Sequence, residues 1–450
     1  MTTEDRGRNE MTRLQFEKSK AFGRRIEQLI PGGSHTYSRG RDRFPAESPN
    51  GIVRGKGPRI WDADGNCLVD WAMGLTAVSL GHADDAVDRA VCAAIKDGVI
   101  FQRSSQLELV AAEAFLSLTG TDMVKFARHG SAVTTAAVKL ARGFTRRAGV
   151  AVPKEHPFFS YDDWFIGTTA CDFGIPDEAK LHTWQFSYGD VASLHDVFRA
   201  HPGEIACVIM EPVKFEPPPD GYLQEVRALC HREGALFILD EMVTGLKLGV
   251  PGAAATLKAE ADLYTYGKGI ANGYANAALT GRGDVMSIGG LEPAGAPKLF
   301  LLSTTHGGES VGLAATIATL QRFADGMIVR QTAQTGELLR DRLQSVIRRH
   351  GLDAHLRIYG YPALMALEVR GPDGRPNAAF QTLFLQEVIA HGVLLQGIFV
   401  PTPSHGEAEI AATEQAFDAA CPVLAQALAQ NTTDGLLIGP PMRPVFRKHL

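Results

Sequence analysis

The chain has 450 residues, of which 45% are hydrophobic and 21% charged, and its formal net charge at pH 7 is −5. This composition is typical of a soluble globular protein with two or three packed cores and excludes a disordered chain. The slightly acidic balance, without a dense run of basic residues, argues against nucleic-acid and anionic-membrane partners. We therefore expect small molecules and a second copy of the chain as partners.

The cysteines and the N-terminus bear on metals and on cellular location. The six cysteines are scattered, without a Cys-x-x-Cys pair or clustered histidines, which argues against a zinc site and a disulfide framework. The first ten residues are too polar for a secretory signal, and no apolar run approaches the roughly 20 residues of a membrane span. The sequence thus predicts a cytoplasmic protein without a metal.

The N-terminal region predicts a helix, an extended arm and a hairpin. Residues 11–30 have a charged, helix-compatible pattern that stops at Pro31-Gly32-Gly33. The following stretch, up to Gly57, is rich in Gly, Pro, Arg and Ser and is typical of an extended arm. Residues 59–70 indicate two short strands with Asp64-Gly65-Asn66 as their turn.

The middle of the chain alternates helical stretches with short apolar strands. This alternation predicts a mainly parallel sheet with helices on both faces, which is an α/β fold. The expected strands are residues 123–127, 157–160, 205–210, 236–239 and 262–266.

The last quarter of the chain predicts a separate α+β layer. Its expected elements are a long helix over 328–349, strands near 363–369 and 393–396, and a helix over 407–428. We expect the N-terminal strands to complete this layer, so that both chain ends build one small domain. The predicted division is residues 1–80 for the arm and part of the small domain, 81–325 for the large domain, and 326–450 for the rest of the small domain.

Lys268 and Asp240 are the first candidates for chemistry. Lys268 lies in a glycine-flanked turn after an apolar strand, and Asp240 ends an earlier strand, Phe-Ile-Leu-Asp. An amine can condense with an aldehyde, and a buried carboxylate can hold a pyridinium nitrogen protonated, which indicates pyridoxal-phosphate chemistry. A lone lysine in a glycine loop is more often solvated. A nucleotide-binding lysine is excluded because the Gly-x-x-x-x-Gly-Lys spacing is absent.

Three further segments can hold a ligand, each with an ordinary structural alternative. Gly130-Ser131 stands between a strand and a helical run, where free backbone N–H groups can bind a phosphate, or where Ser131 merely caps the helix. Tyr161 follows a predicted strand and can stack on a planar ring, or it can be an ordinary half-buried tyrosine. Asp240 and Glu241 form an acidic pair that is costly to bury without donors, which favours a functional use over a surface turn.

One motif supports a different reaction class. Gly308-Glu309-Ser310-Val311-Gly312 matches the nucleophile elbow of serine hydrolases, with Asp353 and His405 available downstream as acid and base. Most of the predicted parallel sheet lies upstream of Ser310, however, and the elbow would then come too late in the fold. We expect Ser310 not to be a nucleophile.

Taken together, these segments resemble the class III, fold type I, pyridoxal-phosphate aminotransferases, and within them the branch that contains glutamate-1-semialdehyde 2,1-aminomutase. The family's Asp-Glu-Val-x-Thr-Gly-Phe-Arg pattern appears at residues 240–247, and its lysine loop appears at residues 265–268. The resemblance covers nearly the whole chain.

The resemblance implies roles for individual residues. Lys268 would form the imine link to pyridoxal phosphate and then move a proton at the substrate α-carbon, while Asp240 would pair with the pyridine nitrogen. The ring would lie between Tyr161 and Met242. The phosphate would bind at Gly130 and Ser131, with Thr305, or alternatively Thr304, reaching it across a homodimer interface.

The resemblance also implies a substrate site, in which this chain departs from its relatives. Arg39 aligns with the mutase arginine that grips the substrate carboxylate. Leu75 stands where the mutase has a pocket tryptophan, and Asp162 follows the stacking aromatic in place of histidine. Glu211 opens a Glu-Pro-Val segment and is also expected to bind substrate, and Glu216 replaces an asparagine after that segment. These changes indicate a more acidic and less aromatic pocket, which favours a polar acceptor such as a sugar.

We therefore expect a homodimeric pyridoxal-phosphate aminotransferase that moves an amino group from an amino acid to a carbonyl compound by a ping-pong mechanism. The alternative on the same fold is an intramolecular aminomutase or epimerase. A third hypothesis is a non-catalytic ligand-binding protein, against which the joint presence of Lys268 and Asp240 argues.

Overall fold

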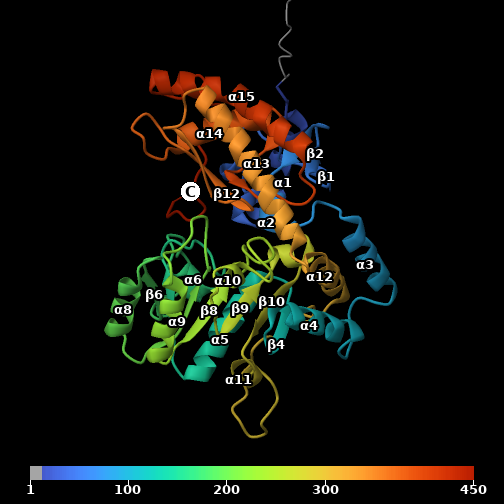
Figure 1. Ribbon diagram of the computed structural model, residues 1–450, viewed down its shortest axis with the longest axis vertical. Coiled ribbons are helices and arrows are strands. Elements are labelled where there is room, and N and C mark those ends of the chain that lie inside the picture. The colour runs from blue at the N-terminus through green and yellow to red at the C-terminus, as the bar shows by residue number, and fades with distance from the viewer. Residues whose placement is uncertain (1–12, 450) are drawn as a thin grey trace, which may run out of the picture.

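A seven-stranded sheet forms the core of the larger part of the molecule (Figure 1). The structure is a computed structural model that describes residues 13–449. In spatial order the strands are β4 (Met123–Ala127), β10 (Ala277–Gly281), β9 (Leu263–Tyr266), β8 (Leu236–Asp240), β7 (Ile205–Met210), β5 (Gly149–Pro153) and β6 (Thr183–Phe186). Only β10 among them runs antiparallel to its neighbours. The predicted mainly parallel sheet is confirmed.

Helices cover this sheet on both faces, because the central strands are apolar on both sides. Every residue of β5, β7 and β8 is buried. Alternate residues of β7 pack into two separate cores, one with α5 (Gly130–Thr145) and the other with α8 (Val191–Ala200) and α9 (Tyr222–Arg232). Such a strand is hydrophobic throughout, as buried parallel strands are.

The remaining helices of this part lie around the sheet and in its connections. They are α3 (Asp85–Lys96), α4 (Gln106–Thr119), α6 (Asp163–Ile166), α7 (Asp177–Lys180), α10 (Ala253–Thr256), α11 (Gly283–Met286) and α12 (Ser310–Phe323), with the 3₁₀ turns η4 (Lys268–Ala271) and η5 (Ser287–Gly289).

The smaller part combines both ends of the chain. A four-stranded sheet has the order β1 (Ile52–Lys56), β2 (Arg59–Asp62), β3 (Cys67–Asp70) and β13 (Val393–Leu394), and a three-stranded sheet has the order β11 (Leu356–Tyr361), β12 (Leu364–Val369) and β14 (Ile398–Phe399). Its helices are α1 (Glu17–Leu29), α13 (Met327–Arg349), α14 (Ala378–Ala390) and α15 (Glu407–Gln430). The parallel pairing of β13 with β3 joins the two chain ends, as predicted.

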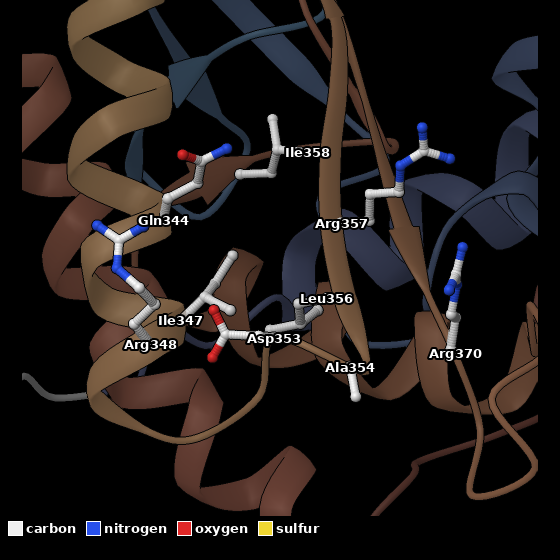
Figure 2. Close-up of a pocket in the computed structure, with 9 residues that line it drawn as sticks. All are labelled: Gln344, Ile347, Arg348, Asp353, Ala354, Leu356, Arg357, Ile358 and Arg370. Carbon is white, nitrogen blue, oxygen red and sulfur yellow. The ribbon is translucent and has the colours of Figure 1, made fainter.

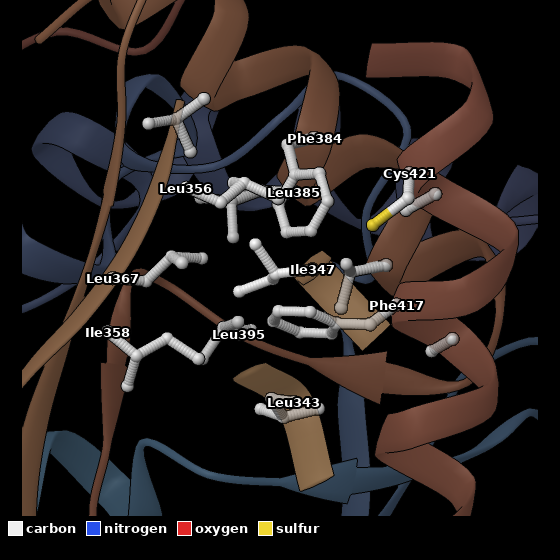
Figure 3. Packing of buried hydrophobic residues seen from close by; sticks show 14 of the residues in the cluster. Leu343, Ile347, Leu356, Ile358, Leu367, Phe384, Leu385, Leu395, Phe417 and Cys421 are labelled. Atoms are coloured by element: carbon white, nitrogen blue, oxygen red, sulfur yellow. The ribbon is translucent and has the colours of Figure 1, made fainter. Parts of the chain in front are cut away.

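A hydrophobic core between these helices and strands holds the smaller part together (Figure 3). Phe384 of α14 and Phe417 of α15 meet edge to face, with ring centroids 4.9 Å apart. Aliphatic side chains from α13 and β11 surround the pair. Among the described residues, no helix is both long and apolar enough to cross a membrane.

The expected strand over 157–160 is wrong, and the structure has β5 and β6 instead. Pro157 lacks the backbone N–H that a ladder needs, and Phe159 is buried in the core from an irregular crossing segment rather than from a strand. The apolar residues of this run therefore pack in the core, but their backbone does not pair with a neighbouring strand. The proposed domain boundaries stay a prediction, and residues 1–12 of the first of these domains lie outside the described residues.

Candidate active site

Lys268 lies directly beyond the end of β9, on a tight turn. Its φ of 47° is in the left-handed region, which is strained for a residue with a side chain and is typical of functional positions. The side chain is half-buried and so remains open to a small molecule. Burial lowers the pKa of its amine, while Glu211 and Asp240 act in the opposite direction.

Two carboxylates face this amine from the neighbouring strands. Asp240 ends β8 and Glu211 follows β7, and their exposed fractions are 3% and 6%. Burial is the main reason why the pKa of Asp240 is raised to about 7. The nearby Glu211 carboxylate also raises this pKa, and its effect is larger than the opposite effect of the Lys268 amine. The carboxyl ends of three adjacent parallel strands thus bring an amine and two carboxylates together, at the edge where such sheets bind ligands.

Hydrogen bonds fix the Asp240 carboxylate in place. Its Oδ1 accepts from the backbone N–H of Met242 at 2.9 Å and from Oγ1 of Thr265 at 3.0 Å. Thr265 belongs to β9, three residues before Lys268, so the same strand orients the carboxylate and presents the amine. Both contacts leave the second oxygen of Asp240 available to a ligand.

A cradle for a ring and a phosphate adjoins these groups. Gly130 opens α5, and a Cβ atom there would lie 2.9 Å from Sδ of Met242. A Cβ at Gly267 would clash with the same sulfur. Because residues 130 and 267 are both glycine, the Met242 side chain can fill the space between the start of α5 and the turn that carries Lys268. The start of α5, with its partial positive charge, is suited to a phosphate group.

The segment after β5 adds an aromatic side chain to the cradle. The Tyr161 backbone N–H donates to Oγ of Ser131 at 3.2 Å, which places the tyrosine beside the start of α5. Its ring is 59% exposed, and its hydroxyl lies 3.2 Å from Nε2 of His129. His129 also caps α5 through Nδ1. The ring is thus free on one face to cover a planar ligand.

Other predicted substrate residues have partners of their own. The Asp162 carboxylate accepts a hydrogen bond from the Thr135 hydroxyl, on α5. Glu216 is exposed and forms an ion pair with Arg357 of β11. Both carboxylates are therefore already engaged, which removes much of the basis for an acidic pocket.

Leu75, Arg39 and Thr305 lie on irregular segments. Leu75 belongs to α2 (Met73–Thr76), where four successive residues have positive φ and form a left-handed turn. Arg39 is exposed, on the 3₁₀ turn η2 (Tyr37–Arg39). Thr305 and its neighbour Thr304 are both exposed in the loop before α12. Within residues 13–449, no hydrogen bond or ion pair joins these residues to Lys268.

Two buried polar residues near the site were not predicted. Lys247 is 5% exposed, and its Nζ has no hydrogen-bond partner among the described residues. This Nζ lies 2.9 Å from the position of a Cβ at Gly269, the residue after Lys268. Burial, and then the charge of Lys268, lower the pKa of Lys247 to about 7. The sequence showed a lysine there, but only the fold reveals its burial.

His156 is the second of these residues. Its Nδ1 accepts from the backbone N–H of Glu211 at 3.1 Å, while Nε2 has no partner among residues 13–449. Burial lowers the pKa of His156 to about 3, so its ring is neutral. Nδ1 of the neutral ring can therefore accept the hydrogen bond from the backbone N–H of Glu211.

The hydrolase motif does not form a nucleophile elbow. Ser310 is the first residue of α12 and follows a loop rather than a strand, and Glu309 caps the helix through the N–H groups of Val311 and Gly312. A separate surface hollow between α13 and β11 is lined by residues such as Gln344, Arg357 and Asp353, the acid considered for the hydrolase motif (Figure 2). It contains none of the residues predicted for the aminotransferase site.

Comparison with known proteins identifies the family. The model of the class III aminotransferases matches residues 44–402. The chain belongs to the class III aminotransferase family. It is 31% identical, over 89% of its length and 94% of the relative's, to a glutamate-1-semialdehyde 2,1-aminomutase of Anaeromyxobacter sp.. It is also 27% identical, over 85% of its length and 91% of the relative's, to a 3-aminobutyryl-CoA aminotransferase of Cloacimonas acidaminovorans.

Solved structures agree with this assignment. The PLP internal aldimine form of the FumI protein of Sphingopyxis sp. MTA144 superposes with a TM-score of 0.84 at 25% identity, over 94% of this chain and 100% of the other. A transaminase with PLP bound gives 0.83 at 26%, over 93% and 99%. This class III aminotransferase is therefore a fold type I enzyme with pyridoxal phosphate as its cofactor, and it acts on small molecules.

Proposed function

We propose that Lys268 and Asp240 are the catalytic residues of an aminotransferase that takes an amino group from an amino-acid donor and gives it to a polar carbonyl acceptor. The observation that carries this proposal is the half-buried Lys268 amine beside the Asp240 and Glu211 carboxylates in a class III chain. Bound pyridoxal phosphate supplies an aldehyde for amine exchange and a ring that takes up the electron pair left on the deprotonated carbon.

The protein's own groups have distinct tasks in this proposal. Asp240 holds a proton at the ring nitrogen, with its carboxylate oriented by Thr265. The Lys268 amine, with its pKa lowered by burial, accepts the proton of the substrate α-carbon and returns it. Glu211 lies beside both groups, so we assign it to this charge cluster rather than to a distant part of the substrate.

The cradle residues bind and orient the cofactor. Gly130 and Ser131, at the start of α5, hold the phosphate, and Met242 supports one ring face while Tyr161 covers the other. This arrangement excludes water from the reacting carbon on both sides. The glycines at 130 and 267 fit this role because neither leaves room for a Cβ beside Met242.

We also propose a homodimer in which the loop before α12 completes the partner's phosphate site. Thr304 and Thr305 are both exposed on this loop, which leaves either hydroxyl available to a second copy. Arg39 is proposed to bind the substrate carboxylate, and Leu75, on its left-handed turn, to shape the pocket. A cytoplasmic location stays a prediction from the sequence.

The test uses the purified enzyme loaded with pyridoxal phosphate and a donor alone. A transaminase converts the cofactor to its amine form and releases an oxo acid, and a screen of carbonyl acceptors then restores the original absorption. The Lys268→Ala variant should lose the absorption of the lysine-bound cofactor and should not turn over. If that variant keeps both properties, the assignment is wrong.

An aminomutase is the second candidate, and the 31% identity to a relative of that name favours keeping it. In that case substrate is isomerised in a single incubation without net release of an oxo acid. The same donor-alone experiment therefore separates the two candidates.

A further inference from the structure

The last residues of the chain return from the smaller part of the molecule towards the larger part. We call residues 431–449 the C-terminal strap; Figure 1 shows its end between the two parts. Its first half is fixed on α14, where the N–H of Ile438 donates to Gln386 at 2.8 Å and the N–H of Met442 donates to Thr382 at 2.9 Å. The strap is thus a docked segment.

The second half of the strap contacts the N-terminal arm. The N–H of Arg443 donates to the carbonyl of Asp42 at 2.8 Å, and the guanidinium of Arg43 donates to the carbonyl of Arg443. Arg447 forms an ion pair with the Asp42 carboxylate at 2.6 Å, with exposed fractions of 24% and 34%. Burial lowers the pKa of the neighbouring Arg43; the Asp42 carboxylate opposes this effect, and the charge of Arg447 adds to it.

The end of the strap reaches the larger part of the molecule. The thiol of Cys171 lies 3.4 Å from the carbonyl oxygen of Arg447 and 3.8 Å from that of Val445. Cys171 belongs to the loop after α6, and α6 itself follows Tyr161 of the candidate active site. The strap therefore joins the arm, α14 and the loop that continues from the cofactor cradle.

The arm depends on such contacts for its position. It consists of three 3₁₀ turns: η1 (Pro31–Gly33), η2, which carries Arg39, and η3 (Arg41–Arg43). These turns contribute to no sheet ladder, and chain ends without ladder or packing contacts are poorly ordered. Besides the strap, the Gln396 side chain donates to the Ser38 carbonyl at 2.7 Å.

We propose that Arg447 is a positioning residue: through Asp42 it clamps the arm so that Arg39 is held where it binds the substrate carboxylate. The role rests on the proposed function, because Arg39 is assigned there. Both sides of the clamp fall outside the residues that the family model matches, 44–402. The clamp therefore lies outside the part of the chain that defines the family.

The test compares Arg447→Gln with Arg443→Gln in the loaded enzyme. The two variants each remove one positive charge, at positions four residues apart. The Arg443 side chain is exposed and makes no hydrogen bond or ion pair within the described residues. Arg443→Gln therefore removes a charge but keeps the backbone contacts of residue 443. Hydrogen exchange of residues 36–46 should become up to about fivefold faster in Arg447→Gln, as expected for loss of one partly exposed ion pair, and should stay unchanged in Arg443→Gln.

Kinetics then test the consequence for substrate. In Arg447→Gln, KM for an amino-acid donor should rise up to about fivefold with kcat nearly unchanged, while KM for an amine donor without a carboxylate should not change. In an Arg39→Gln background, Arg447→Gln should add nothing.

Each of three results overturns the proposal. Equal exchange in the two variants refutes the clamp itself, whatever the function of Arg39. Faster exchange with an equal KM effect on both donors refutes its positioning role. An Arg39→Gln variant that turns over with an unchanged KM refutes the role assigned to Arg39, and with it the positioning role of Arg447. An enzyme that never exchanges amino groups refutes the proposed function instead.

Discussion

Replacing Lys247 by Met should stabilise the enzyme without cofactor, and the gain should shrink as the pH rises. The Nζ of Lys247 is buried beside the Lys268 turn without a hydrogen-bond partner among the described residues. A buried charge without a partner is costly, and replacing it by an apolar side chain of similar length removes this cost.

The size of the effect follows from the pKa of Lys247. Burial lowers it from 10.5 to about 7, and each pH unit is worth about 1.4 kcal/mol, so the cost at pH 7 is about 5 kcal/mol. At pH values between about 7 and 10.5, Lys247 carries a proton in the unfolded chain but not in the folded chain. The free energy of unfolding of the wild type therefore rises with pH by up to about 1.4 kcal/mol per unit through this residue, and the Met variant lacks this rise.

Urea unfolding at pH 7, 8 and 9, at one protein concentration, measures both quantities. The difference between Lys247→Met and wild type should be largest at pH 7 and smaller at each higher pH. Lys96→Met serves as the control, because Lys96 is exposed at the end of α3. Parallel pH dependences for wild type and Lys247→Met, or a less stable Met variant at pH 7, would refute the reasoning.

Three other substitutions test the site. Asp240→Asn should lower kcat by about 10² to 10³-fold, because an amide cannot hold the ring nitrogen protonated; wild-type kcat would remove Asp240 from the mechanism. Gly267→Ala should weaken cofactor binding, measured by equilibrium dialysis, because its Cβ meets Sδ of Met242, and it should weaken binding less in a Met242→Ala background than in the wild type; equal effects in the two backgrounds would contradict the cradle. Ser310→Ala should leave the rate of amino transfer unchanged, whereas a large loss would revive the hydrolase motif.

The positions of Asp240 and Lys268 in the fold could be predicted because both stand at strand ends. Asp240 ends an uninterrupted apolar run, Lys268 follows the largely buried strand β9, and the carboxyl ends of parallel strands meet at one edge of a sheet. The ends of β4 and β7 were likewise predicted to the residue. Here local pattern and tertiary position agree, since a fully apolar run of this length has little other use than as a buried strand.

Other features could not be predicted because tertiary packing decides them. The left-handed turn at 73–76 contains a single glycine, so its backbone conformation has no local signal. The burial of Lys247 depends on how its turn packs against Gly269, which no periodicity encodes. The engagement of Asp162 by Thr135 likewise joins residues 27 positions apart in the chain.

The residues proposed for the chemistry lie in regular elements whose positions could be predicted, whereas residues proposed for substrate binding lie on irregular segments. Lys268, Asp240 and Gly130 stand at the ends of strands or at the start of a helix beside one sheet, so the sheet fixes their positions relative to one another. Leu75 and Arg39 lie on irregular segments that the sheet does not constrain, and such segments tolerate change. This division accounts for relatives named both as an aminomutase and as an aminotransferase of an acyl-CoA compound on one catalytic frame. It also directs a search for the substrate of this enzyme to the arm, its strap and the left-handed turn rather than to the residues around Lys268.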